Sequence, residues 1–252
     1  MEPSVRKEWL ETDGRGGFAS GTTAGIRTRR YHALLLVATT PPTGRMALVN
    51  GFDAWVTTAA GTFPISSQAY APDVIHPDGV RRIASFEADP WPRWRFRLED
   101  GTALEQEIFV VAGPVGETTS AGASTSASRT ARAVVVVAWR LSKPAPGVML
   151  AVRPFLSGRN QHALHRENPN FRFHAAVSDD VVRWQPYPDV PGIVAETNGA
   201  YAHRPDWYRN FRYDEERARG LDFVEDLASP GIFTWDLSRG EAVWILRSDR
   251  SP

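Results

Sequence analysis

The sequence predicts an all-β protein, built as a large, mainly antiparallel sandwich of two sheets with one or two short helices. Most of the chain consists of short extended segments separated by its 20 glycines and 19 prolines. Residues 93–97 alternate between arginine and an aromatic side chain, which places an apolar row on one face of a strand and an arginine row on the other. Only residues 212–221 carry a helical pattern. Because the expected strands are evenly spaced, we expect residues 1–252 to form a single domain.

The N-terminal segment 14–36 is rich in glycine and ends in an apolar run. Gly14, Gly16 and Ala19 match the spacing of a dinucleotide-binding loop, but such a loop needs a strand before it and a helix after it. The flanking stretches "WLETD" and "GTTAG" favour neither, so we exclude nucleotide binding. Two interpretations stay open. The glycines either form tight turns that Phe18 holds to the core, or support a surface that contacts a partner domain or a polyhydroxylated ligand. That surface would present Arg27, Arg29, Arg30, Tyr31 and His32.

Two apolar segments are expected to supply inner strands, and a third is expected to form a hairpin. Residues 31–38 and 131–141 are continuously apolar and rich in leucine or valine, which is typical of strands covered on both faces. Residues 46–58 contain two apolar runs joined by Asn50 and Gly51. This pair tolerates positive φ angles, so the sequence predicts a tight hairpin turn there.

The helical stretch at residues 212–221 is short. Glu215 and Arg219 are four residues apart, and a glycine follows where a helix commonly ends. We expect Glu215 and Glu216 to be surface charges paired with the arginines of the same helix. Residues 113–132 are small, polar and low in complexity, which predicts a flexible excursion between two strands.

Composition excludes several classes of function. The 29 basic and 29 acidic residues give a net charge of zero, so nothing in the overall charge favours nucleic acid or an anionic membrane as a partner. The chain has no cysteine, which excludes disulfides, thiolate catalysis and zinc held by cysteine. No apolar leader or membrane-spanning run is present, and we therefore expect a cytoplasmic protein.

Histidines and a carboxylate cluster in "SGRNQHALHRENP". His162, His165 and Glu167 could perform acid–base chemistry on a sugar, as in an aldose epimerase. A metal site is not expected, because no further cluster of ligands accompanies them and Arg159 and Arg166 would repel a cation.

The C-terminal quarter is rich in carboxylates and aromatic rings. A glycosidase needs two carboxyl groups on either side of the scissile bond, a separation that sequence cannot reveal. Trp207, Tyr208, Arg209 and Asn210 combine rings with planar polar groups, so we expect an interface or a glycan contact at this cluster.

Four blocks of sequence carry a resemblance to a known family. They are "EWLETDGRGGFASGTTAGIRTRRYHALLL", "RPFLSGRNQHALHRENPNF", "WQPYPDVPGI" and "WYRNFRYDEERARGLDFVEDLASPGIFTWDL". Together they closely resemble the N-terminal domain of prokaryotic-type glycogen debranching enzymes, the amylo-α-1,6-glucosidase family, over about residues 8–246. The serine-rich excursion departs from that pattern.

The resemblance implies a β supersandwich of galactose-mutarotase-like shape that precedes an (α/α)6 barrel carrying the catalytic carboxylates. This chain ends where such a barrel would begin, so no catalytic residue, metal or cofactor is expected in it. The expected partners are that barrel and glycogen or another branched α-glucan. The alternatives are a stand-alone glycan-binding module and an epimerase-like enzyme. The candidate contact residues are Arg29, Arg30, Tyr31, His32, His162, His165, Glu167, Trp207, Tyr208 and Asn210.

Overall fold

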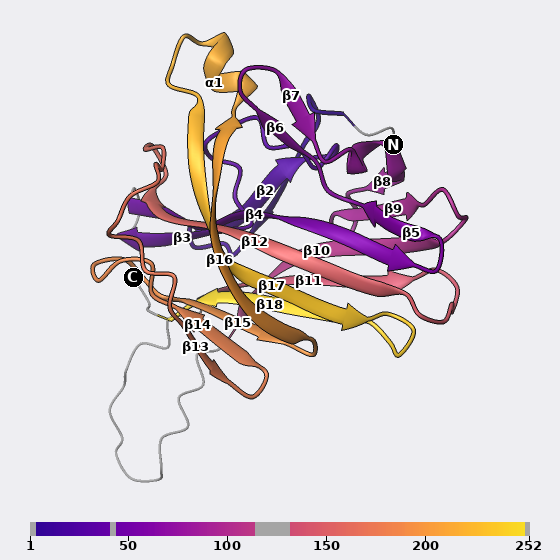
Figure 1. Ribbon diagram of the computed structural model, residues 1–252. Coiled ribbons are helices and arrows are strands. Elements are labelled where there is room, and N and C mark those ends of the chain that lie inside the picture. The colour runs from indigo at the N-terminus through magenta and orange to yellow at the C-terminus, as the bar shows by residue number, and fades with distance from the viewer. Residues whose placement is uncertain (1–3, 41–43, 114–131, 250–252) are drawn as a thin grey trace.

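The computed structural model describes residues 4–40, 44–113 and 132–249, which form two antiparallel sheets. The larger sheet contains β1 (Glu8–Thr12), β2 (Phe18–Thr22), β3 (Leu35–Thr40), β4 (Gly44–Thr58), β5 (Gly61–Pro64), β6 (Gln68–Tyr70), β7 (Val74–His76), β12 (Met149–Asn160), β16 (Ala200–Arg212) and β17 (Val224–Asp236). Its strand order is β1-β2-β3-β4-β12-β17-β16-β6-β7, and β5 pairs with β4. Figure 1 shows its long central strands curving across the molecule.

The smaller sheet contains β8 (Ile83–Glu87), β9 (Arg93–Arg97), β10 (Ala103–Gly113), β11 (Arg132–Leu141), β13 (Ala175–Ser178), β14 (Val181–Trp184), β15 (Ile193–Thr197) and β18 (Ala242–Ser248). Its order is β13-β14-β15-β18-β11-β10-β9-β8. In the described part of the chain, the helical segments are the 3-10 turn η1 (Gly79–Arg82) and α1 (Asp214–Ala218). The predicted all-β sandwich with one or two short helices is confirmed.

Aromatic side chains from both sheets fill the space between them. Phe52 of β4 packs edge to face with Trp139 and Trp244 from the smaller sheet, with ring centroids 5.6 and 6.1 Å apart. Trp139 also contacts Trp235 of β17 at 5.9 Å. Trp139 and Trp244 are fully buried. These contacts join the two sheets, because each ring covers apolar area on a strand of the opposite layer.

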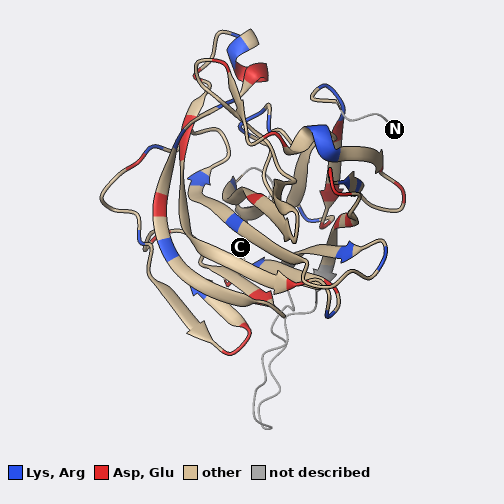
Figure 2. Cartoon of the chain, turned by 45° about the vertical axis from the view of Figure 1, so that its right-hand side comes forward, with Lys and Arg blue, Asp and Glu red and all other residues tan. Residues whose placement is uncertain are grey.

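The alternating pattern of β9 is confirmed. Trp94 and Phe96 are buried in the core, while Arg95 lies on the outer face of the sheet. Its guanidinium forms ion pairs with Glu87 at 2.7 Å and Glu105 at 2.9 Å on the neighbouring strands. Figure 2 likewise shows basic and acidic segments interspersed in that view, with no face of one sign.

Of the two strands expected to be covered on both faces, only β3 meets that expectation, since its successive residues Leu35, Leu36 and Val37 are all buried. In β11 the inward side chains Val135, Val137 and Trp139 are buried, but the alternate positions are only partly covered, because no third layer packs on this sheet among the described residues. The strand expected at residues 31–38 begins only at Leu35, since His32 N–H closes a turn on the Arg29 carbonyl at 3.1 Å.

The predicted hairpin at Asn50 and Gly51 is wrong. β4 continues through both residues, and its pairing with β12 shifts register between Phe155 and Leu156, which marks a β-bulge whose extra residue is Asn50. The hairpin lies eight residues further on, where β4 and β5 pair from Thr58 to Gly61. The Asn50 side chain takes part in a buried polar network described below.

The helical prediction is confirmed at α1, and Gly220 has the positive φ angle (70°) expected just beyond its end. Of the predicted excursion at residues 113–132, residues 114–131 lie outside the described part of the chain.

Candidate functional site

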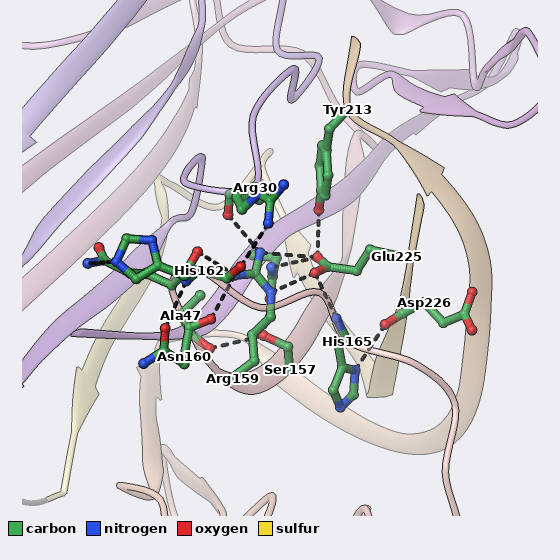
Figure 3. A network of polar contacts seen from close by, with 12 residues as sticks. Arg30, Ala47, Ser157, Arg159, Asn160, His162, His165, Tyr213, Glu225 and Asp226 are labelled. Atoms are coloured by element: carbon green, nitrogen blue, oxygen red, sulfur yellow. Dashed lines mark hydrogen bonds and ion pairs between the residues drawn. The ribbon is translucent and has the colours of Figure 1, made fainter. Parts of the chain in front are cut away.

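A buried ion pair lies where β12 ends and β17 begins (Figure 3). Arg159 Nε and Glu225 Oε2 are 2.6 Å apart, and the two side chains are 4% and 0% exposed. The register of β12 against β4 shifts just before Arg159, which turns this part of the strand away from regular pairing. Removing two charges from water costs several kcal/mol per ion, so such a pair persists only when further hydrogen bonds satisfy it.

Glu225 receives three of those hydrogen bonds. Tyr213 Oη and Asn50 Nδ2 donate to Oε1 at 2.6 and 3.1 Å, and the His165 backbone N–H donates to Oε2 at 3.1 Å. Asn50 in turn accepts a hydrogen bond of 2.6 Å from Ser157 Oγ. Burial raises the pKa of Tyr213, and the charge of Glu225 raises it further. Tyr213 is therefore a hydrogen-bond donor and stays protonated.

Arg159 connects this network to the glycine-rich N-terminal segment. Its Nη2 donates to the Arg30 carbonyl at 2.7 Å. Burial alone would lower the pKa of Arg159, but the charge of Glu225, the hydrogen bond to it and the contact with Tyr213 together outweigh burial and raise the pKa. The ion pair thus holds a fixed positive group beneath the backbone of residue 30.

Arg30 itself clamps three segments together. Its backbone N–H donates to Glu216 Oε1 at 3.1 Å, and its guanidinium donates to the carbonyls of His162 and Asp222 at 2.8 and 3.1 Å. Glu216 was expected on the helix surface beside Glu215, and for Glu216 that expectation is wrong. Its side chain is 1% exposed and lies 3.6 Å from Arg30 Nε. A helix of a single turn is too short for its sequence to show which side is buried. Only the packing of the folded chain shows that Glu216 points inward.

Tyr31 and His162 lie side by side above this clamp. Tyr31 Oη is 3.1 Å from His162 Nδ1, and the rings meet edge to face with centroids 5.7 Å apart. His162 is exposed and Tyr31 is half-buried. The structure therefore brings together two candidates from distant parts of the sequence and presents them at the surface. We call Arg30, Tyr31 and His162 the rim.

Arg29 and His32 face the first strand. Arg29 forms an ion pair with Glu8 at 2.6 Å and lies 3.4 Å from Glu215. His32 is buried, its Nδ1 accepts the Thr28 backbone N–H at 3.1 Å, and its Nε2 lies 3.5 Å from Glu8 Oε1. This arrangement fits a neutral imidazole with its proton on Nε2. Burial, aided by the charge of nearby arginines, lowers the pKa of His32 to about 4.

The shifted pKa of His32 predicts a loss of stability in mild acid. Because the folded pKa of about 4 lies below the ordinary value of 6.5, protons bind preferentially to the unfolded chain. The contribution is complete above pH 6.5 and is lost as the pH falls toward 4. We expect it to reach about 3 kcal/mol, measured by urea unfolding at several pH values. His32→Asn keeps an acceptor for Thr28 and should flatten this dependence, whereas the exposed control His174→Asn should not. Equal slopes for parent and His32→Asn would contradict the prediction.

His165 and Trp207 are packed inside a second cluster. His165 Nδ1 is 2.9 Å from the Asp226 carbonyl and donates to it, so Nε2 accepts the Tyr187 hydroxyl at 2.7 Å. Burial lowers the pKa of His165. The ring lies 5.4 Å from that of Trp207, which also contacts Phe171 at 5.3 Å. Both ring nitrogens of His165 are thus already bonded within the protein.

Tyr208 lies on the opposite face of β16 from Trp207. It packs against Phe155 at 5.2 Å, and the Arg153 guanidinium lies 4.7 Å from its ring. Arg153 is also 4.7 Å from the ring of Trp55 on β4. The structure therefore separates the two adjacent aromatic candidates, because successive side chains of a strand point to opposite faces.

Glu167 and Asn210 lie near His165. Glu167 forms an ion pair with Arg209, and its backbone N–H donates to Asp226 at 3.2 Å. Asn210 has a φ angle of 66° at a bulge in β16, and its backbone N–H donates to Asp226 Oδ1 at 2.9 Å. Asparagine tolerates this left-handed conformation better than most residues. The backbones of Glu167 and Asn210 are therefore fixed by hydrogen bonds to the Asp226 carboxylate.

Within residues 4–40, 44–113 and 132–249, no group of three or more histidines and carboxylates could hold a metal ion. Over the same residues, no helix has both the length and the apolar character needed to cross a membrane.

Comparison with known families identifies the chain. A family model described as "Glycogen debranching enzyme N terminal" matches residues 7–244. The chain belongs to this family. The matched range includes the rim and the whole buried network, so these are parts of the glycogen debranching enzyme N-terminal domain. No curated protein sequence matches the chain significantly.

Sequence reasoning missed the residues that organise this part of the N-terminal domain, namely Asn50, Ser157, Arg159, Tyr213 and Glu225. Arg159 was considered only as a cation that would repel a metal. One signal was available, since Arg159 and Glu225 each interrupt or border an apolar strand in blocks that carry the family resemblance. Their pairing could not be found, because 66 positions separate them.

Proposed function

We propose that this chain is the non-catalytic β-sandwich domain of a cytoplasmic glycogen debranching enzyme. In this proposal residues 1–252 form one domain that packs beside the helical catalytic domain and forms one wall of the cleft for the branched α-glucan. The observation that carries the proposal is the family match over residues 7–244, together with a rim that is rigid beneath and polar at its surface.

The geometry of the rim suits it to a polar partner. Arg30 is held by Glu216 and by two backbone carbonyls. Because the neighbouring residues are already fixed in place, little conformational entropy is lost when a partner binds to the rim. Tyr31 and His162 present a hydroxyl, an imidazole and two ring surfaces, which are groups that hydrogen-bond and stack on sugar rings. A preorganised surface of this kind favours binding to a glucan or to a domain that presents one.

The two carboxylates buried beneath the rim are not available to a sugar, which favours a non-catalytic role. Glu216 and Glu225 are buried, and each already pairs with an arginine. Hydrolysis of a glycosidic bond needs two carboxyl groups open to the sugar. The epimerase alternative gains no support either, because both ring nitrogens of His165 are bonded within the fold.

Substitution of the rim is expected to weaken substrate binding. In the debranching enzyme that carries this domain, Tyr31→Ala combined with His162→Ala should raise KM for a branched limit dextrin about tenfold, with kcat nearly unchanged. Loss of one or two hydrogen bonds and a ring contact corresponds to about that factor. His174→Ala, an exposed histidine away from the rim, is the control. An unchanged KM, or a loss confined to kcat, would contradict the proposal. The isolated chain should release no glucose from the same substrate.

A stand-alone glycan-binding role is the second candidate. The cluster of Trp55, Arg153 and Tyr208 on the larger sheet favours it, because a partly exposed guanidinium between two partly exposed rings offers hydrogen-bond donors and apolar surface to a sugar. The test is migration of the isolated chain in gels that contain glycogen. Retardation that Tyr208→Ala abolishes would favour this role, and unchanged mobility would exclude it.

A further inference from the structure

An open pocket of about 540 Å³ lies at the surface between two loops, residues 161–174 after β12 and residues 185–192 between β14 and β15. Sites that bind small molecules usually have volumes of about 300–1,000 Å³, so the pocket has room for a ligand of that size. None of its lining residues belongs to the rim or to the cluster of Trp55, Arg153 and Tyr208. The pocket is therefore a separate candidate site.

Two aromatic rings line this pocket. Phe171 and Tyr187 meet edge to face, with ring centroids 5.6 Å apart. The Tyr187 hydroxyl donates to His165 Nε2 at 2.7 Å and accepts from Asn168 Nδ2 at 2.8 Å. These two hydrogen bonds fix the tyrosine ring before a ligand arrives, which reduces the entropy that binding would lose.

Polar side chains without partners stand beside the rings. Asn170, Arg172 and Asp189 line the pocket, and all three are exposed. Among the residues that the structure describes, none of these three side chains forms a hydrogen bond or an ion pair. Their backbone is held, since the Arg172 N–H donates to the Pro186 carbonyl at 3.0 Å and joins the two loops. The pocket thus offers free donors on a guanidinium and an amide, and free acceptors on a carboxylate and the same amide.

This set of groups indicates the chemistry of the ligand. A hydroxyl both donates and accepts hydrogen bonds, so a molecule with several hydroxyls can satisfy a carboxylate and a guanidinium in one pocket. Arg172 and Asp189 carry opposite charges, which favours a neutral ligand over an anion. The rings of Phe171 and Tyr187 favour a ligand that also has apolar C–H faces. A sugar ring combines these properties.

We propose that this pocket is a second carbohydrate site, which binds a glucosyl unit of an α-glucan. Asp189 accepts hydrogen bonds from its hydroxyls, and Arg172 and Asn170 donate to them. The choice of glucan among sugars rests on the proposed function, whereas the preference for a neutral polyhydroxylated ring rests on the pocket alone. A polymer long enough to reach both this pocket and the rim would bind more tightly than either site allows by itself.

The test is calorimetric titration with maltotriose of the full chain carrying Tyr31→Ala and Tyr208→Ala. These two changes remove a ring from the rim and one from the other glycan candidate, so the binding that remains reports on the pocket. Saturable binding is expected in this background. Arg172→Met and Asp189→Asn, each added to it, should weaken binding about tenfold, because each removes hydrogen bonds that involve a charged group.

Arg239→Met and Asp180→Asn in the same background are the matched controls. Both residues are exposed and lie outside the pocket, so these variants should bind maltotriose like the background. Thermal unfolding of each variant shows that it is folded before it is titrated.

Absence of saturable maltotriose binding, or equal binding by the pocket variants and the controls, would overturn the proposal. Binding of glycine or inorganic phosphate that depends on Arg172, without binding of maltotriose, would also overturn it, because the pocket would then prefer a charged ligand. Failure of the rim function appears instead as an unchanged KM when Tyr31 and His162 are replaced. The two failures are therefore distinguishable.

Discussion

Glu225→Gln is expected to lower the free energy of unfolding by about 3–5 kcal/mol, because it leaves Arg159 as a buried cation without a counter-ion. The amide keeps the shape of the carboxylate, so the loss reflects charge more than packing. For a chain of this length the melting temperature should fall by about 10 °C. Urea unfolding at pH 7 measures the free energy directly.

A double-mutant cycle tests whether the pair acts as a unit. Arg159→Met alone leaves the carboxylate unpaired, but in the Arg159→Met/Glu225→Gln variant no buried charge remains. The double variant should therefore lose clearly less than the sum of the single changes. Glu241→Gln is the matched control, since Glu241 is exposed and lies 3.8 Å from its arginine partner. A Glu225→Gln loss no larger than that of Glu241→Gln would contradict the expectation.

The second large effect is expected at Trp139→Ala. Trp139 is fully buried, and its ring touches Phe52 and Trp235 of the opposite sheet. Its indole N–H also donates to Gln106 Oε1 at 2.9 Å. Truncation creates a cavity between the sheets and leaves the amide oxygen without its donor, for a loss of about 3–5 kcal/mol.

Chemical unfolding of Trp139→Ala should show this loss with an unchanged slope against denaturant. Trp139→Phe fills part of the space and should lose clearly less. Val177→Ala, at a side chain that is 57% exposed, should stay within about 0.5 kcal/mol of the parent. If Trp139→Ala lost under 1 kcal/mol, the ring would not join the sheets in the way described.

The network around Glu225 also explains why the rim can be rigid at a surface. Arg159 holds the Arg30 carbonyl, and Arg30 holds Glu216 and the backbone of His162. Each contact joins segments that are far apart in the chain. A change deep in the network therefore reaches the rim through main-chain contacts.

Local pattern was a good guide where a strand buries one face. In β9 the alternation of arginine with Trp94 and Phe96 correctly predicted which face is buried and which is exposed, because successive side chains of a strand point to opposite faces and only one face of this sheet is buried. The helix α1 was also predicted from local pattern, because Gly220, which has a left-handed backbone conformation, follows its last turn.

Local pattern failed where a distant partner overrides it. Asn50 and Gly51 favour a turn in isolation, yet β4 continues through them because Asn50 bonds to Ser157 and Glu225. Glu216 lies in a run of charged residues that is typical of a helix surface, yet its side chain is buried against Arg30. Trp207 and Tyr208 are neighbours in sequence, which predicts one aromatic cluster, but the strand places their rings on opposite faces.

Composition, spacing and family blocks therefore suffice for the β class of this protein, for several of its strands and for its family, since these depend on local preferences and on short motifs. Which polar residues meet was decided by tertiary structure alone. Arg159, Glu225 and Arg30 come from separate strands and loops, and a buried charge is stable only where its partners converge in space.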